Sequence, residues 1–191
     1  MNKGMLVVLS APSGCGKDTV YTELCKIRND IVKSVSATTR TKRDGEVEGV
    51  NYYYLSKDEF EYLIKNNGLI EYTSYNNCYY GTPISNVTNA VNEGKICFLI
   101  IEVEGAQNIM KLFPDDCVSI FLLPPSFEVL EKRLRGRDSD NEDVIQGRLK
   151  IAKDELTYKD KYDYNVINDK LDACVDEINQ IISAELSKRN A

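Results

Sequence analysis

The stretch A-P-S-G-C-G-K-D-T at residues 11–19 decides the fold class of this 191-residue chain. It follows an apolar run, M-L-V-V-L at 5–9, and precedes apolar residues at helical spacing, Val20, Leu24 and Ile27. The order of strand, glycine-rich turn and helix is typical of a phosphate-binding loop. Glycine adopts backbone angles that let successive N–H groups point at an anion beside a helix N-terminus. The stretch therefore predicts a site for a nucleoside triphosphate.

Every residue of this stretch is a candidate ligand of the triphosphate. The set is Ala11, Pro12, Ser13, Gly14, Cys15, Gly16, Lys17, Asp18 and Thr19. The general pattern G-x-x-x-x-G-K-[ST] has glycine in place of Ala11 and a hydroxyl in place of Asp18. Lys17 supplies a cation, and the oxygens of Asp18 and Thr19 are candidate ligands of Mg²⁺, which prefers hard oxygen donors. The alternative is a glycine-rich turn that binds nothing.

Composition limits the chemistry and the partners. A 42% hydrophobic content suits one well-packed domain, and a net charge of −6 argues against nucleic acid as a partner. The chain has no histidine, which excludes Ser-His-Asp triads and histidine-ligated zinc. Six cysteines without C-x-x-C spacing indicate a reducing compartment, the cytoplasm. The run at 5–9 is too short to span a membrane.

The remaining pattern predicts an α/β fold. Continuous apolar runs at 96–101 and 117–123 are typical of strands buried on both faces of a parallel sheet. Helical patterns are expected at 56–66, 84–92, 126–135, 142–156 and 172–188. Half-polar, tyrosine-rich strands at 52–55 and 69–80 indicate a smaller mixed sheet inserted into the main one.

One segment carries a family resemblance. Residues 34–52, S-V-S-A-T-T-R-T-K-R-D-G-E-V-E-G-V-N-Y, closely resemble the GMP-binding segment of guanylate kinases, which are P-loop nucleoside monophosphate kinases. Similar motifs follow in family order: I-E-Y at 70–72, Y-Y-G-T at 79–82, E-V-E-G-A-Q at 102–107, P-P-S at 124–126, R-L-R-G-R at 133–137, G-R-L at 147–149 and V-I-N-D at 166–169.

The resemblance implies a function and a division of the chain. The expected activity is magnesium-dependent transfer of a phosphate from ATP to GMP or dGMP, in purine nucleotide metabolism, by a monomer or homodimer. The implied parts are a parallel-sheet core at 1–33, 93–126 and 156–191, a GMP-binding lobe at 34–92, and a helical lid at 127–155.

The GMP site is expected in the lobe. Arg40 and Arg43 lie three apart, and each presents a planar fork of donors that suits phosphate oxygens. By resemblance, the other GMP ligands are Ser36, Tyr52, Glu71, Tyr80, Thr82 and Glu102. Guanine offers two adjacent N–H donors, so a site that selects it needs a carboxylate. Taken singly, these residues have simpler explanations. The two arginines also fit a solvated basic turn, Glu71 fits a surface carboxylate at a strand edge, and the hydroxyls of Ser36 and Thr82 fit turns.

The resemblance also implies the catalytic residues. Lid arginines would reach the triphosphate on closure, and Asn168 would lie near the adenine ring. The expected catalytic set is Lys17, Arg43, Arg133, Arg137 and Arg148. Arg133 and Arg137 are spaced to share one helical face. The alternative for the lid is a solvated face with ion pairs to Glu131, Glu142 and Asp143.

Four positions depart from the family pattern. Ile100 stands where the family has an acidic residue, Glu102 where it has aspartate, and Glu104 where it has glutamine. Asp18 departs in the same neighbourhood, and we hypothesise that it takes over part of the metal's ligand shell. These departures leave two alternatives: a binding module without turnover, and a kinase with a different monophosphate acceptor.

Overall fold

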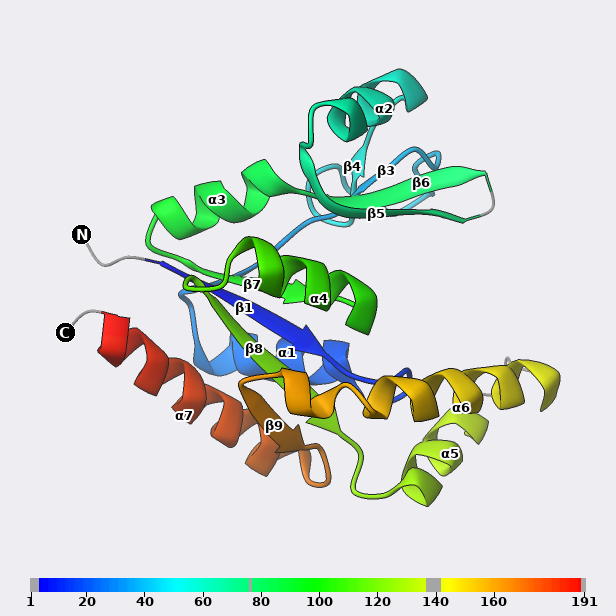
Figure 1. Cartoon of the computed structure of the whole chain (residues 1–191), viewed down its shortest axis with the longest axis vertical. Coiled ribbons are helices and arrows are strands. Elements are labelled where there is room, and N and C mark those ends of the chain that lie inside the picture. Colours follow the sequence, from blue (N-terminus) through cyan, green and yellow to red (C-terminus); the bar gives the residue numbers. More distant parts are fainter. Residues whose placement is uncertain (1–3, 76, 137–141, 190–191) are drawn as a thin grey trace.

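A five-stranded parallel sheet forms the centre of the molecule (Figure 1). The computed structural model describes residues 4–75, 77–136 and 142–189. The strand order is β2-β7-β1-β8-β9. The strands are β1 (Met5–Ser10), β2 (Ile31–Lys33), β7 (Ile96–Ile100), β8 (Cys117–Leu123) and β9 (Tyr164–Ile167). β1 is the central strand of this order, and each of its residues is buried, as expected for a strand covered on both faces.

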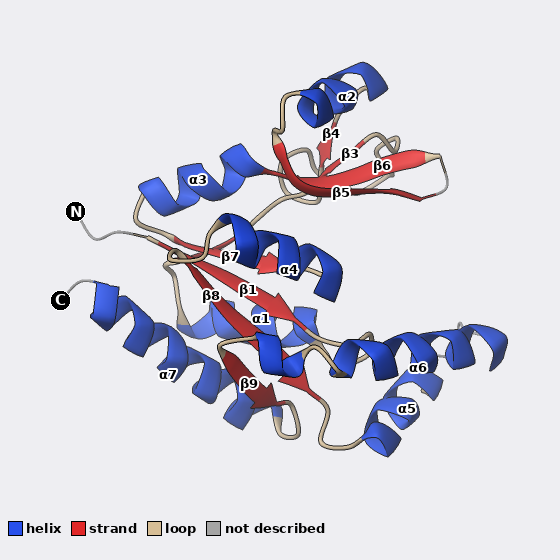
Figure 2. Cartoon of the chain, in the orientation of Figure 1, coloured by secondary structure: helices blue, strands red, loops and turns tan. Residues whose placement is uncertain are grey.

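Helices cover both faces of this sheet, as Figure 2 shows. They are α1 (Lys17–Ile27) and α7 (Leu171–Arg189) on one face, and α3 (Ile84–Asn92) and α4 (Val103–Leu112) on the other. Side chains alternate along β1, so Val7 and Leu9 pack with α1 and α7, whereas Leu6 and Val8 pack with α3 and α4. The predicted α/β fold with a parallel-sheet core is confirmed.

A second sheet lies apart from the first and is mixed, as predicted (Figure 1). Its order is β4-β3-β6-β5, formed by β3 (Ala37–Thr38), β4 (Tyr53–Tyr54), β5 (Leu69–Tyr75) and β6 (Cys78–Pro83). Helix α2 (Lys57–Lys65) covers it. Ser56 and Glu59 form a capping box at the start of α2, which satisfies backbone donors that the first turn leaves free.

Two further helices pack against the end of the core near the phosphate loop. They are α5 (Phe127–Arg135) and α6 (Glu142–Leu156), and a short 3₁₀ helix, η1 (Lys159–Lys161), follows. Leu130, Leu134 and Leu149 from this pair belong to the same buried cluster as β1. None of the helices that the structure describes has the length and apolar character needed to cross a bilayer.

Five elements were not predicted from the sequence: α4, η1, the short strand β3, and the edge strands β2 and β9 of the core sheet. Edge strands have one neighbour and are partly exposed, so they lack the continuous apolar runs by which β7 and β8 were found. The helices expected at 56–66, 84–92, 126–135, 142–156 and 172–188 are present, with ends shifted by at most a residue or two.

The core predicts a large cost for truncating Phe98. Its side chain is fully buried on β7, and its ring lies 5.7 Å from that of Tyr21. Phe98→Ala removes this packing and leaves a cavity, so we expect the free energy of unfolding to fall by about 3–5 kcal/mol in urea titration. Tyr62→Ala is the control, because that side chain is 65% exposed, and it should change stability by less than about 0.5 kcal/mol. Equal effects of the two variants would contradict this assignment of the core.

Candidate active site

The turn between β1 and α1 has the geometry of a phosphate loop. Gly14 and Gly16 have φ of 90° and 85°, in the left-handed region that glycine occupies without steric cost. Gly16 is the N-cap of α1 and has no side chain to cap the helix, and among the described residues no side-chain hydrogen bond to the first N–H groups of α1 is found. These donors and the positive end of the helix dipole are therefore free to bind an anion.

A pocket of about 200 Å³ opens on this turn. Its lining consists of Pro12, Ser13, Gly14, Gly16, Lys17, Asp18, Thr19 and Glu102. Ala11 and Cys15 are buried beneath it. The structure thus gathers most of the predicted triphosphate residues around one cavity and adds Glu102, which was expected at the GMP site instead.

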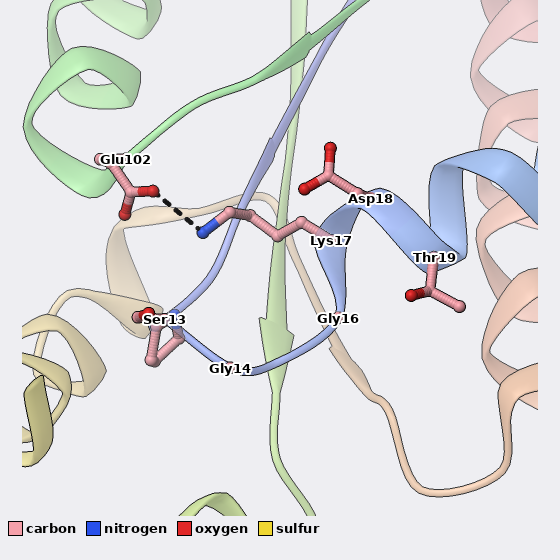
Figure 3. A pocket seen from close by; sticks show the side chains of 8 residues that line it. Ser13, Gly14, Gly16, Lys17, Asp18, Thr19 and Glu102 are labelled. Atoms are coloured by element: carbon pink, nitrogen blue, oxygen red, sulfur yellow. Dashed lines mark hydrogen bonds and ion pairs between the residues drawn. The ribbon is translucent and has the colours of Figure 1, made fainter. Parts of the chain in front are cut away.

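Lys17 reaches across the pocket towards α4. Its Nζ donates to the carbonyl oxygen of Ala11 at 2.8 Å and lies 3.3 Å from Oε1 of Glu102 (Figure 3). The Lys17 side chain is 12% exposed, whereas that of Glu102 is 68% exposed. Lys17 is thus held at the loop by a backbone contact and meets a solvated, exchangeable carboxylate.

Asp18 and Thr19 extend in different directions from the first turn of α1 (Figure 3). Asp18 is exposed and lies 3.4 Å from Nζ of Lys33, a long ion pair. Thr19 is exposed as well. Within the described residues no cluster of three His, Cys, Asp or Glu side chains is spaced to hold a metal ion. A metal at this turn would need ligands from the nucleotide and from water in addition to the protein.

Asn168 supports the phosphate loop from below. Its side chain is 7% exposed, and Nδ2 donates to the carbonyl oxygen of Cys15 at 2.7 Å. Nη2 of Arg133 donates to the carbonyl oxygen of Asn168 at 2.9 Å. Arg133 therefore contacts Asn168, the residue whose side chain stabilises the phosphate loop. Among the described residues no ion pair joins Arg133 to Glu131 or Glu142, as the alternative of a solvated lid face would have it; both carboxylates pair with Arg135.

The structure describes one of the other two predicted lid arginines, Arg148, but not Arg137. Arg148 lies on α6, as predicted, and is half-buried. Arg137 lies outside the described residues, so the shared helical face with Arg133 stays a prediction. Helix α5 ends at Arg135.

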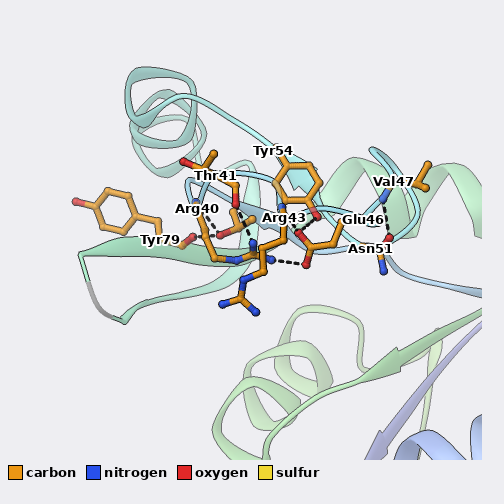
Figure 4. Close-up of polar contacts among 9 residues, drawn as sticks. Arg40, Thr41, Arg43, Glu46, Val47, Asn51, Tyr54 and Tyr79 are labelled. Carbon is orange, nitrogen blue, oxygen red and sulfur yellow. Dashed lines mark hydrogen bonds and ion pairs between the residues drawn. The ribbon is translucent and has the colours of Figure 1, made fainter.

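The mixed sheet gathers the predicted phosphate-end residues. The guanidinium of Arg40 lies 5.5 Å from the ring centroid of Tyr52, and the rings of Tyr52 and Tyr80 are 6.0 Å apart. Ser36 precedes β3, and its carbonyl oxygen accepts the N–H of Tyr53 at 2.9 Å. Arg43 follows in the next loop, with its guanidinium extending away from Glu46 (Figure 4). These residues come from three segments that are distant in sequence.

Glu71 and Thr82 form a second cluster in the same lobe. Oγ1 of Thr82 donates to Oε1 of Glu71 at 2.7 Å, across the β5–β6 pair. Burial and the nearby Glu104 carboxylate raise the pKa of Glu71, against the hydrogen bond from Thr82. Glu71 lines a cavity of about 520 Å³ together with Glu102 and Asn108. This cavity and the phosphate-loop pocket share Glu102, so the two sites are neighbours.

Sequence reasoning missed two carboxylates. Glu46 binds both arginines of the lobe, as described below. Glu155 on α6 lies near Lys17 and Glu102; burial and the Glu102 charge raise its pKa to about 7, and Oε2 is buried without a hydrogen-bond partner. The available signal for Glu155 was its spacing of three from Ala152, a buried position on α6.

The fold and the site together define a class of protein. A phosphate loop at the carboxyl end of a central parallel strand faces a separate sheet that carries arginines and tyrosines. This is the arrangement of a nucleotide kinase built on a P-loop.

Comparison with known proteins identifies the family. The guanylate kinase family model matches residues 3–185. A guanylate kinase from Halalkalibacterium halodurans is 46% identical over 187 residues, which are 98% of this chain and 91% of that protein. One from Rickettsia felis is 45% identical over 98% of this chain and 97% of its own length. The crystal structure of guanylate kinase from Anaplasma phagocytophilum superposes with a TM-score of 0.74 at 35% identity, covering 97% of this chain and 88% of that one. The chain belongs to the guanylate kinase family.

The raised pKa of Glu155 predicts a pH-dependent cost to stability. In the unfolded chain this carboxyl ionises near its ordinary pKa of 4.5, but in the folded chain only near 7. Between these values the folded state binds more protons than the unfolded state, so its stability falls as pH rises. Glu155→Gln removes the ionisation. We expect the variant to be more stable than the parent at pH 8 and equal to it near pH 4, measured by urea unfolding.

The neighbouring exposed residue Asp154 provides the control for this series. Asp154→Asn should show no gain in stability between pH 4 and pH 8. A Glu155→Gln variant whose advantage over the parent did not grow with pH would contradict the assigned ionisation.

Proposed function

We propose that this chain transfers the terminal phosphate of ATP to GMP. The observation that carries the proposal is that the phosphate-loop pocket adjoins the cavity beside Glu71, because Glu102 lines both. The glycine turn with Lys17 suits one anion, and the lobe that carries Glu71 also carries Arg40 and Arg43, which suit a second. A kinase needs such a pair of sites to bring donor and acceptor phosphates together.

The lobe residues suit guanosine monophosphate. Glu71 can accept from the two N–H donors on the guanine edge, and Thr82 holds its Oε1 at 2.7 Å. Adenine lacks that pair of donors, so a bound AMP would leave a buried carboxylate unpaired. Arg40, Arg43, Tyr52 and Tyr80 would receive the phosphate of GMP. Ser36 would complete the site at the base.

The reaction needs no general base. The attacking oxygen belongs to the phosphate of GMP and is already anionic at neutral pH, which agrees with the absence of histidine. Catalysis would come from alignment of the two phosphates and from neutralisation of charge on the transferred group. Lys17 and the arginines at 43, 133, 137 and 148 would supply the positive charge, and closure of α5 and α6 would exclude water.

Asp18 and Thr19 fit a magnesium ion that arrives with ATP. Both carry oxygen donors and both are exposed beside the loop, and the ion pair between Asp18 and Lys33 is long, at 3.4 Å. When bound, the ion would neutralise phosphate charge. The parts of the chain would be the core at 1–33, 93–126 and 156–191, the GMP lobe at 34–92 and the lid at 127–155. The setting would be purine nucleotide metabolism in the cytoplasm, as a monomer or homodimer, with neither nucleic acid nor membrane as a partner.

The proposed function is tested by ADP production from ATP and magnesium with GMP, AMP, UMP or no acceptor. Turnover should occur with GMP and fall at least about a hundredfold in Lys17→Ala, because the loop loses its cation. Lys26→Ala is the matched control, since Lys26 is an exposed lysine at the far end of α1 that pairs with Glu23. Binding of GMP without turnover by the parent would favour a binding module instead. Turnover with another monophosphate would indicate a different acceptor.

A second prediction concerns the metal. Asp18→Ala should raise the magnesium concentration required for half-maximal turnover by about tenfold while leaving the KM for GMP unchanged, because one oxygen donor is lost. Lys33→Ala is the control, since it breaks the same ion pair and keeps the carboxylate. An Asp18→Ala variant with an unchanged magnesium requirement would refute the metal role.

A further inference from the structure

One carboxylate in the mixed-sheet lobe collects three donors and has no role in the function proposed above. Oε1 of Glu46 lies 2.6 Å from Nη2 of Arg40. Its Oε2 accepts the N–H of Arg43 at 2.8 Å and the hydroxyl of Tyr54 at 2.7 Å. Figure 4 shows these groups converging on the carboxylate. The Glu46 side chain is only 19% exposed, so the cluster is more enclosed than a surface ion pair.

The cluster fixes Arg40 through its side chain. Nη2 is held by Glu46, and Nη1 donates to the carbonyl oxygen of Thr41 at 2.8 Å. The guanidinium carbon of Arg40 lies 5.5 Å from the ring centroid of Tyr52 and 5.8 Å from that of Tyr54, within the range of cation–π contacts. Guanidinium carries five N–H donors, so donors beyond these two contacts remain for an anion in a defined orientation.

The same carboxylate fixes Arg43 through its backbone. Glu46 accepts the N–H of Arg43, and the N–H of Glu46 donates to the carbonyl oxygen of Arg43 at 3.1 Å. Gly45, at a φ of 83°, permits this tight turn. The guanidinium of Arg43 extends away from Glu46, and no ion pair of that group is found among the described residues (Figure 4). Glu46 thus binds Arg40 through its guanidinium and Arg43 through its backbone N–H.

We propose that Glu46 is a positioning residue for the phosphate end of the acceptor monophosphate, which it serves by orienting Arg40 and Arg43 before the nucleotide binds. The proposal rests on the function proposed above. A preformed pair of arginines loses less conformational entropy on binding than two free side chains do. The donors around Glu46 hold its pKa at about 2, so the carboxylate is ionised at neutral pH.

Positioning and net charge predict opposite results when Glu46 is neutralised. The carboxylate cancels one positive charge beside a site for an anion, so its removal would tighten phosphate binding if charge alone mattered. Its removal weakens phosphate binding if the orientation of the arginines matters more. The direction of the change therefore decides between the two roles.

The experiment measures dissociation constants of the full chain for GMP and for guanosine, which lacks the phosphate, by isothermal titration. In Glu46→Gln the ion pair is lost, while the amide oxygen can still accept from Arg43 and Tyr54. We expect GMP to bind about tenfold more weakly, guanosine to bind unchanged, and the KM for ATP to stay constant. Glu46→Ala, which loses all three contacts, should weaken GMP further.

Glu48→Gln is the matched control. Glu48 lies two residues away and is exposed, and its carboxylate accepts the N–H of Tyr54; within the described part of the chain no hydrogen bond or ion pair joins it to either arginine. The Glu48→Gln variant should bind GMP and guanosine with the same dissociation constants as the unsubstituted protein. A merely structural role for Glu46 would weaken guanosine and GMP equally, because the whole lobe would be affected.

Three results would overturn the proposal: tighter GMP binding in Glu46→Gln, equal losses for GMP and guanosine, or no change in either. Failure of the proposed function looks different. In that case the unsubstituted protein itself would bind neither GMP nor guanosine, and no acceptor phosphate would exist for Glu46 to serve.

Discussion

The left-handed backbone at Gly14 and Gly16 is the constraint on which the rest of the site depends. It turns the chain from the central strand into α1 within six residues and leaves the first N–H groups of the helix free. The loop is held in place from outside, because the buried Asn168 side chain binds the Cys15 carbonyl and Arg133 binds the Asn168 carbonyl. β9 and α5 thereby stabilise a turn that glycine alone would leave free to move.

Glu102 connects the two halves of the site. It is the N-cap of α4, directly after β7, and it lines the phosphate pocket, the cavity beside Glu71 and the space between α4 and α6. Burial and the Glu102 charge raise the pKa of Glu155 on α6, whereas burial and the Glu104 carboxylate raise the pKa of Glu71 on the lobe. Negative charge accumulates where nucleotide phosphates would be expected to bring more, so the compensating cations must come from the loop, the lobe and the lid.

Local patterns predicted the parts of the fold in which burial is continuous, and they failed where a long-range contact decides the structure. β7 and β8 are apolar throughout and were found, whereas the edge strands β2 and β9 were not. Helix α4 was missed in part because it contains Gly105. The structure explains this glycine, since a Cβ there would lie 2.5 Å from Cδ1 of Ile101 and 3.3 Å from Cγ of Glu71. Glycine lowers helix propensity, but here it lets the helix approach the lobe. Glu46 and Glu155 escaped notice for a related reason, because their importance lies in contacts with residues on other segments.

Two ion pairs at the site differ in a way that suits their positions. Lys17 and Glu102 are 3.3 Å apart and the carboxylate is largely exposed, so a phosphate can replace it at small cost. Arg40 and Glu46 are 2.6 Å apart, both mostly buried, and the carboxylate is held by two further donors. An arriving anion cannot displace Glu46 without leaving those donors unpaired, which is unfavourable. In the proposed reaction, Glu102 would be a temporary partner for the Lys17 cation until the donor nucleotide binds, and the Arg40–Glu46 pair would remain intact in the acceptor site. Because the chain has a net charge of −6, its overall field would repel anionic nucleotides, so local cations such as Lys17 and Arg40 would have to supply the attraction.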